Sequence, residues 1–182
     1  MDRSYPIGKV TDYATRDRST LEAVAACMEQ TAQEWRSTVQ SLPDAELNRT
    51  YREGSWTMRE LVHHAADAHM HGLIRLKYGL VEDGYVIKPM EQQAWLGLAD
   101  TRLPPQASLD LLEALNLRWG ALLRGLDPAE LGREVVHPQE GRQDLWRLIA
   151  KHDWHLRHHL AHVRLALEGS TGSDHDLHAE RR

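Results

Sequence analysis

The sequence has little of several features that mark particular classes of protein. Its single cysteine, Cys27, excludes an intramolecular disulfide and is typical of a reducing cytoplasm. No stretch approaches the roughly 18 apolar residues that a membrane span requires, and no apolar segment follows Arg3 as it would in a signal peptide. We therefore expect a cytoplasmic protein that does not enter the membrane.

Concentrated positive charge is also absent. The formal net charge is -5 with histidines neutral, and the 22 Lys and Arg residues are scattered along the chain. Nucleic-acid phosphates attract a concentrated positive surface. We therefore expect no nucleic-acid partner.

Apolar residues recur at helical spacing in four long segments. Ser19-Thr20-Leu21-Glu22 and Thr57-Met58-Arg59-Glu60 have the form of capping boxes, which mark helix starts. A chain of 182 residues suits one domain. The pattern predicts an all-α four-helix bundle over residues 1–169 and a polar, disordered tail over 170–182. The expected helices cover residues 19–42, 57–80, 108–125 and 144–168.

The connections between these helices carry weaker signals. Residues 91–98 favour a short helix, and Pro128 suits the first position of a helical turn. Residues 135–141 favour an extended arm or a small hairpin. Two connections are longer than a simple up-down bundle needs, so we expect crossovers or the mouth of a site there.

Histidine is the residue type that stands out. The chain has 12 histidines, and nine of them fall in two clusters on the second and fourth expected helices. Imidazole is a common ligand of zinc, nickel, copper and iron. The clusters therefore favour a metal site between two helices. Their members are His63, His64, His69 and His71, and His152, His155, His158, His159 and His162.

Helix geometry selects among the five histidines of the last helix. At about 100° per residue, His155 and His159 lie one turn apart at the border of the apolar face. His158 and His162 have the same spacing but turn away from the centre of that face, so we expect them to lean towards solvent. The geometry favours His155 and His159 without excluding His152 or His162.

A third ligand must come from the other cluster. Catalytic zinc-type sites typically have three protein ligands and an open position. His64 shares a face with Leu61, Ala65 and Ala68 and is the preferred third ligand, with His69 as the alternative.

Other catalytic templates are missing. Leu156 follows His155, so there is no H-E-x-x-H motif, and no G-x-S-x-G elbow or Walker A loop occurs. Nor does the four-Glu set of di-iron bundles appear. A neutral three-histidine set leaves the charge of a dication uncompensated, which favours lowering the pKa of a bound water or stabilising a bound thiolate.

Several stretches together resemble the YfiT branch of the DinB superfamily. The likeness runs in order over about residues 4 to 168, and the combination is specific although each stretch alone is weak. One departure is Arg157, which stands where the family often has another histidine and lies off the expected metal face. The stretches are SYPIG (4–8), YREGSWT (51–57), VHHAADAHM (62–70), RWGALLR (118–124) and WHLRHHLAH (154–162).

The resemblance carries expectations of its own. It implies a four-helix bundle, usually dimeric, that holds one divalent ion per subunit, zinc or nickel, with water completing the shell. Matched position by position, its ligands fall on His64, His155 and His159. It also implies a metal-dependent hydrolase or a thiol S-transferase, such as a bacillithiol transferase.

We therefore expect an enzyme acting on a small molecule, with water or a low-molecular-weight thiol as the nucleophile. Glu60, His63, Asp67 and His69 are candidates for a general base or for groups that orient the ligands, and the sequence does not rank them. The alternative is a metal- or thiol-binding module without turnover, such as a sensor or carrier.

Overall fold

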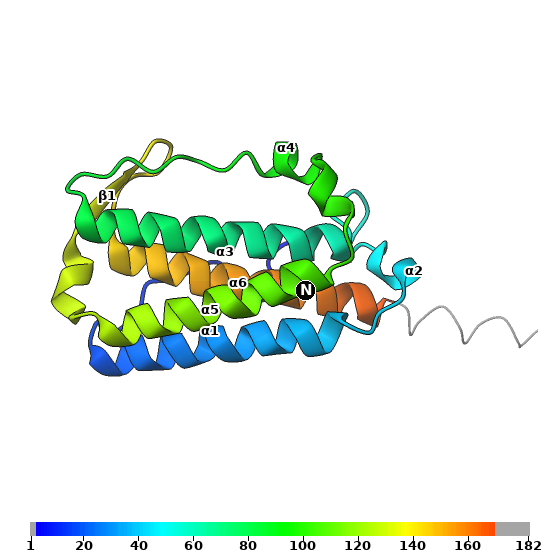
Figure 1. Ribbon diagram of the computed structural model, residues 1–182, viewed down its shortest axis with the longest axis horizontal. Coiled ribbons are helices and arrows are strands. Elements are labelled where there is room, and N and C mark those ends of the chain that lie inside the picture. The colour runs from blue at the N-terminus through cyan, green and yellow to red at the C-terminus, as the bar shows by residue number, and fades with distance from the viewer. Residues whose placement is uncertain (1–2, 170–182) are drawn as a thin grey trace, which may run out of the picture.

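Four long helices form a bundle (Figure 1), as the apolar periodicity predicts. The computed structural model describes residues 3–169, and the expected tail at 170–182 lies outside the described residues. No helix within residues 3–169 is both long enough and apolar enough to cross a membrane. The four helices are α1 (Arg18–Val39), α3 (Met58–Val81), α5 (Gln106–Gly125) and α6 (Leu145–Glu168).

The bundle does not follow a simple up-down path. α1 packs against α5 and α6, and α3 packs against the same two helices, so α1 and α3 lie on opposite corners. Figure 1 shows α3 and α5 running in the same direction, with the segment between them returning along the whole bundle. That return requires the long connection over residues 82–105. It contains α4 (Gln92–Leu96) and the 3-10 helix η1 (Ala99–Arg102).

Capping residues set the helix starts, and one expected cap is wrong. The Thr57 hydroxyl accepts from the Glu60 N–H while the Glu60 carboxylate accepts from the Thr57 N–H, which confirms the second capping box. α1 instead begins after Asp17, whose carboxylate accepts from the Thr20 N–H. Ser19 therefore lies inside the first turn, because the aspartate two residues earlier occupies the capping position.

The expected arm or hairpin near residue 135 is a hairpin. Strands β1 (Glu134–His137) and β2 (Gly141–Asp144) pair antiparallel, with Val135 opposite Gln143. The return segment joins β1 through hydrogen bonds from the Ile87 N–H to the Val136 carbonyl and from the Val136 N–H to the Tyr85 carbonyl. Two short elements complete the described chain, α2 (Asp44–Leu47) and the 3-10 helix η2 (Pro128–Gly132).

The apolar core is divided into two clusters along the bundle. In α3 the core residues stop at Ala66 and resume at Leu73, and in α6 they stop at Ile149 and resume at Leu156. The residues between these positions include His69 on α3, and His152 and His155 on α6. A polar layer therefore crosses the middle of the bundle; of the candidate ligands, His155 lies in it, and His64 and His159 lie beside it among residues of one apolar cluster.

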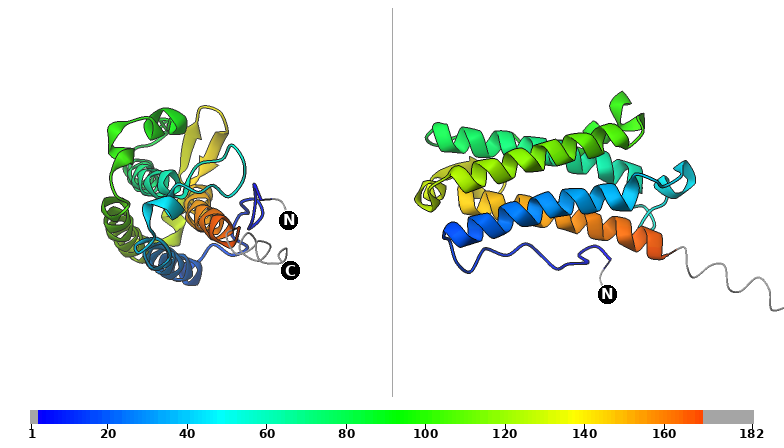
Figure 2. Two further views of the ribbon diagram at one scale, coloured as in Figure 1. Left: turned by 90° about the vertical axis from the view of Figure 1, so that its right-hand side faces the viewer. Right: turned by 60° about the horizontal axis from the view of Figure 1, so that its bottom comes forward.

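The N-terminal segment covers one side of α6 (Figure 2). The Arg3 guanidinium donates to the Leu165 carbonyl at 3.1 Å, and the Trp154 indole N–H donates to the Gly8 carbonyl at 2.9 Å. This segment encloses a face of α6 that a bare bundle would leave in water.

Gly72 of α3 packs tightly against α6. A Cβ on Gly72 would lie 2.5 Å from ring atoms of His152, so the ring would have to move. Replacing glycine by alanine inside a helix usually stabilises by about 1 kcal/mol. We expect Gly72→Ala to lower the free energy of unfolding instead, as measured by urea denaturation.

Gly125→Ala is the matched control for this change. Gly125 ends α5, and a Cβ there would meet nothing within 4 Å. This variant should be neutral or slightly stabilising. A gain in stability for Gly72→Ala equal to that of the control would contradict the close approach.

Candidate metal centre

Three histidines converge between α3 and α6. One ring nitrogen each from His64, His155 and His159 lies within 4.8 Å of the others. The Nε2 atoms of His64 and His155 are 3.0 Å apart. Two imidazole nitrogens bound to one tetrahedral zinc at 2.0–2.1 Å lie roughly 3.3 Å apart. The three side chains therefore fit a single ion with small adjustments.

Burial keeps these imidazoles neutral. His64 is only 1% exposed, and burial lowers its pKa to about 4. Burial likewise holds the pKa values of His155 and His159 well below the usual range, and the neighbouring histidines lower them further. A metal binds the unprotonated nitrogen, so this environment supplies ligands at neutral pH.

Packing helps to orient the rings, because two of their outer nitrogens lack protein hydrogen bonds. The Nδ1 atoms of His64 and His155 are buried and have no hydrogen-bond partner among residues 3–169. The Trp56 ring lies 4.7 Å from the His64 ring, and the His155 and His159 rings meet edge-on at 4.4 Å. Metal-bound histidines usually donate their other N–H to a protein acceptor or a water. Among residues 3–169, no group accepts a hydrogen bond from Nδ1 of His64 or His155.

The expectation that His158 and His162 lean towards solvent is wrong. They are 6% and 2% exposed. Trp154 stacks on the His158 ring at 4.1 Å, and Tyr51 stacks on the His162 ring at 3.8 Å. The helical wheel does not predict this burial, because residues of the loops and of the N-terminal segment cover that face of α6. Tyr5 is one of them.

These two histidines form a second group with His159. One nitrogen from each of the three also lies within 4.8 Å of the others, and His159 Nδ1 is 3.3 Å from His162 Nδ1. His159 thus belongs to both groups. His69, the alternative third ligand, belongs to neither, because its Nε2 bonds the His152 carbonyl at 3.1 Å.

None of the four candidate bases belongs to either histidine group, although the His69 ring lies 6.5 Å from the His155 ring. Glu60 is held in the capping box of α3, and His63 bonds the Ser108 hydroxyl at 2.7 Å and the Leu103 carbonyl at 3.1 Å. Burial and the charge of Asp100 raise the pKa of Asp67 to about 6.

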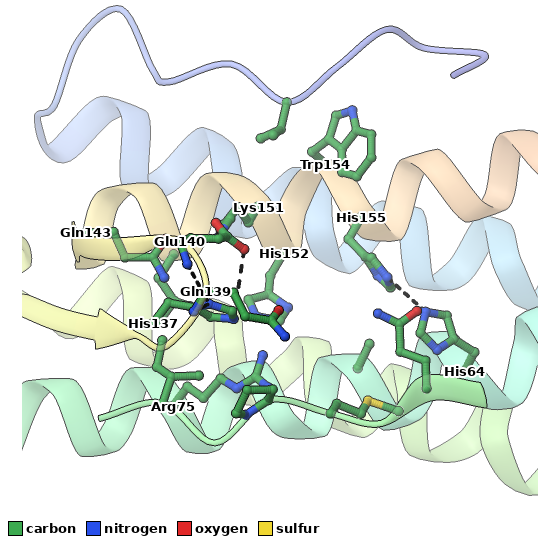
Figure 3. A pocket seen from close by; sticks show the side chains of 17 residues that line it. His64, Arg75, His137, Gln139, Glu140, Gln143, Lys151, His152, Trp154 and His155 are labelled. Atoms are coloured by element: carbon green, nitrogen blue, oxygen red, sulfur yellow. Dashed lines mark hydrogen bonds and ion pairs between the residues drawn. The ribbon is translucent and has the colours of Figure 1, made fainter. Parts of the chain in front are cut away.

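Two cavities border the three-histidine group, and none of these four candidates lines either of them. The first has a volume of about 300 Å³ and reaches His64, His152 and His155 (Figure 3). The second, of about 530 Å³, reaches His155 and His159. Trp154 borders both cavities. The second is also lined by Tyr51 and Trp56, near the end of the N-terminal segment.

About half of the residues that line the first cavity come from outside the four long helices. The hairpin contributes His137, Gln139, Glu140 and Gln143, while the return segment contributes Ile87, Pro89, Met90 and Gln92. Sequence reasoning placed none of these residues in the site. The only signal was the unusual length of the two connections, which is consistent with the mouth of a site.

Fold and site together define a four-helix-bundle protein with a candidate three-histidine metal centre. The model of the DinB superfamily matches residues 28–163. The chain therefore belongs to the DinB superfamily, as its motifs indicate.

Relatives agree with this assignment. A protein of Oceanobacillus iheyensis named "putative metal-dependent hydrolase" is 37% identical over 163 residues, which cover 90% of this chain and 95% of that protein. The structure of YfiT from Bacillus subtilis, described as a "probable metal-dependent hydrolase with an unusual four-helix bundle topology", superposes with a TM-score of 0.87. It is 33% identical, and the match covers 93% of this chain and 99% of YfiT.

A more distant structure shares only the fold. A mycothiol-dependent maleylpyruvate isomerase superposes with a TM-score of 0.62 at 16% identity, over 81% of this chain and 62% of that one.

Metal content of single variants tests the ligand set. We expect His64→Ala, His155→Ala and His159→Ala each to remove most of the bound zinc or nickel, because each removes one of three nitrogens that meet at one point. Elemental analysis of the purified variants measures this, with circular dichroism as a check of helix content.

Two further variants separate this group from the second one. His71→Ala is the control, since His71 lies against Trp95 and belongs to neither group. His158→Ala should also retain the metal. Loss of the metal from His158→Ala together with retention in His64→Ala would mean that the second group holds the ion.

The buried histidines should also make the metal-free protein sensitive to acid. Burial lowers the pKa values of His64 and His69 to about 4, from 6.5. Between these values the unfolded chain binds more protons than the folded one, so the free energy of unfolding falls as pH decreases. The slope is at most about 1.4 kcal/mol per pH unit for each histidine. Asp67 opposes this, because its raised pKa acts in the other direction.

Urea denaturation from pH 6.5 down to about 5 measures this effect, since most carboxylates titrate lower. The protein should be kept metal-free with a chelator. A free energy of unfolding that stays constant or rises over this interval would contradict neutral buried histidines.

Proposed function

We propose that this protein is a metal-dependent hydrolase in which His64, His155 and His159 hold one divalent ion, zinc or nickel. The observation that carries the proposal is the convergence of three neutral imidazoles at a point that borders two cavities. A bound dication with an open position lowers the pKa of water or of a thiol and so supplies a nucleophile at neutral pH.

The protein's own residues shape the surroundings of that point. Trp56 and Trp154 line the 530 Å³ cavity together with His155 and His159, so one wall beside the centre is aromatic. The return segment and the hairpin form much of the other cavity and limit the access of water. Such enclosure strengthens electrostatic interactions within a site.

Transfer of a low-molecular-weight thiol to an electrophile is the second candidate. Both cavities reach His155, which suits a reaction with two substrates. We further propose that the protein is cytoplasmic. We also propose that it forms a homodimer, as the resemblance to the family implies.

Two substrate sets distinguish these reactions. Metal-loaded protein should hydrolyse nitrophenyl acetate, or should join cysteine to a bromobimane, and chelation should abolish the turnover. Added metal should restore it. His155→Ala should lose the activity because His155 belongs to the ligand group and borders both cavities, whereas His71→Ala should keep it.

A binding module gives a different result. Tight metal binding with no turnover of either substrate set would overturn the enzyme proposal and support a sensor or carrier.

A further inference from the structure

The first cavity has a second polar end, away from the candidate metal centre. Figure 3 shows His137, Gln143 and Arg75 at one end and His64 and His155 at the other. At a rise of 1.5 Å per residue, the backbones of His64 and Arg75 lie roughly 16 Å apart along α3. The Arg75 side chain leans back toward the helix N-terminus, which shortens the gap. The cavity thus joins two polar regions within reach of one small molecule.

Arg75 is a partly buried cation with no carboxylate in direct ion-pair contact among residues 3–169, and the charge of Glu140 acts on it only at longer range. One Nη donates to the Lys88 carbonyl at 2.8 Å, whereas Nε is buried and has no partner. Among residues 3–169 no carboxylate oxygen lies within 4.0 Å of its guanidinium. Burial lowers the pKa of Arg75 below its usual value. A buried charge is unfavourable unless it is paired, so this arrangement needs a compensating role.

Gln143 supplies a second unpaired donor at this end. Its Oε1 accepts from Lys151 Nζ at 3.0 Å, and its Nε2 is buried without a partner in the described part of the chain, residues 3–169. The Lys151 charge is already engaged, because its ammonium also pairs with Glu140. Of the two cations that line the cavity, only Arg75 therefore lacks a carboxylate partner.

We propose that this end of the cavity binds the carboxylate of a small-molecule substrate whose reacting group lies at the candidate metal centre. The carboxylate accepts from the Arg75 guanidinium and the Gln143 amide, which line this end of the cavity; because Arg75 Nε and Gln143 Nε2 are buried, these side chains turn toward the carboxylate when it binds. A single negative charge suits the subsite, since a dianion such as phosphate would also face Glu140. The inference deepens the proposed function and rests on it for the position of the reacting group.

Binding to metal-free protein tests the subsite without the metal. We expect hexanoate to bind in calorimetric titrations and hexanamide to bind at least about tenfold more weakly, because a charge-assisted contact is lost. Arg75→Met should weaken hexanoate binding by a similar factor, and Arg75→Lys by less. Arg118→Met, at an exposed position of α5, is the charge-matched control and should bind normally.

Some outcomes of this titration overturn the proposal. Equal binding of acid and amide, or no change in Arg75→Met, would do so. Inorganic phosphate binding more tightly than hexanoate in an Arg75-dependent way would overturn the choice of a carboxylate.

We expect Arg75→Met to lose hexanoate binding without a folding defect. Arg75→Met removes an unpaired buried charge, so its midpoint of urea denaturation should equal or exceed that of the wild type. Gln143→Glu is the second variant. It places a carboxylate beside Arg75 and should abolish hexanoate binding through competition and repulsion.

Thiol probes in cobalt-loaded protein test whether one molecule reaches both ends of the first cavity. A thiol bound to cobalt is visible by absorbance, so ω-mercapto acids and ω-mercapto alcohols of equal length can be compared. At the length that spans the cavity, the acid should bind about tenfold more tightly than the alcohol, and Arg75→Met should remove the difference. Equal binding at every length in the wild type would overturn the subsite while leaving the metal centre intact.

The two proposals fail in different ways. If the metal centre is wrong, His155→Ala leaves thiol binding unchanged, yet hexanoate still binds metal-free protein in an Arg75-dependent way. If only the subsite is wrong, thiols still bind cobalt and the hexanoate titration shows nothing.

Discussion

The close packing of α3 against α6 is the constraint on which the rest of the structure depends. A Cβ on Gly72 would lie 2.5 Å from ring atoms of His152, so a larger residue there would displace the ring or push the two helices apart. This close packing places His64 Nε2 3.0 Å from His155 Nε2 although the two residues are far apart in the sequence. Small residues let helices approach closely, and here the close packing brings candidate ligands from two helices together.

The polar layer across the bundle is unfavourable for stability and is best understood through the site. Burying imidazoles without hydrogen-bond partners opposes folding, and the unpaired Nδ1 atoms of His64 and His155 show that the protein residues do not compensate it. The unpaired Arg75 is a second case in the same cavity. Local conflicts of this kind are expected at functional sites, where binding rather than stability has shaped the sequence.

The bundle supplies the candidate ligands, and the connections supply the surroundings. α3 and α5 run in the same direction, so the chain must return along the bundle before α5 begins (Figure 1). That return pairs with β1 near Ile87 and forms one wall of the cavity. The N-terminal segment, through contacts such as Trp154 with Gly8, closes another side. A rigid scaffold with variable loops around it is a common way to place a site.

The sequence alone predicted the four helices. It also predicted that His64 on one helix, and His155 and His159 on another, lie toward the core, because helical periodicity is a local property of the chain. Only the tertiary structure decided that His158 and His162 are buried, since the residues that cover them come from distant segments. It also decided that the candidate bases lie away from the cavities and that the hairpin and Arg75 line one of them. Periodicity shows which way a side chain faces on its own helix, whereas packing between segments decides what it meets there.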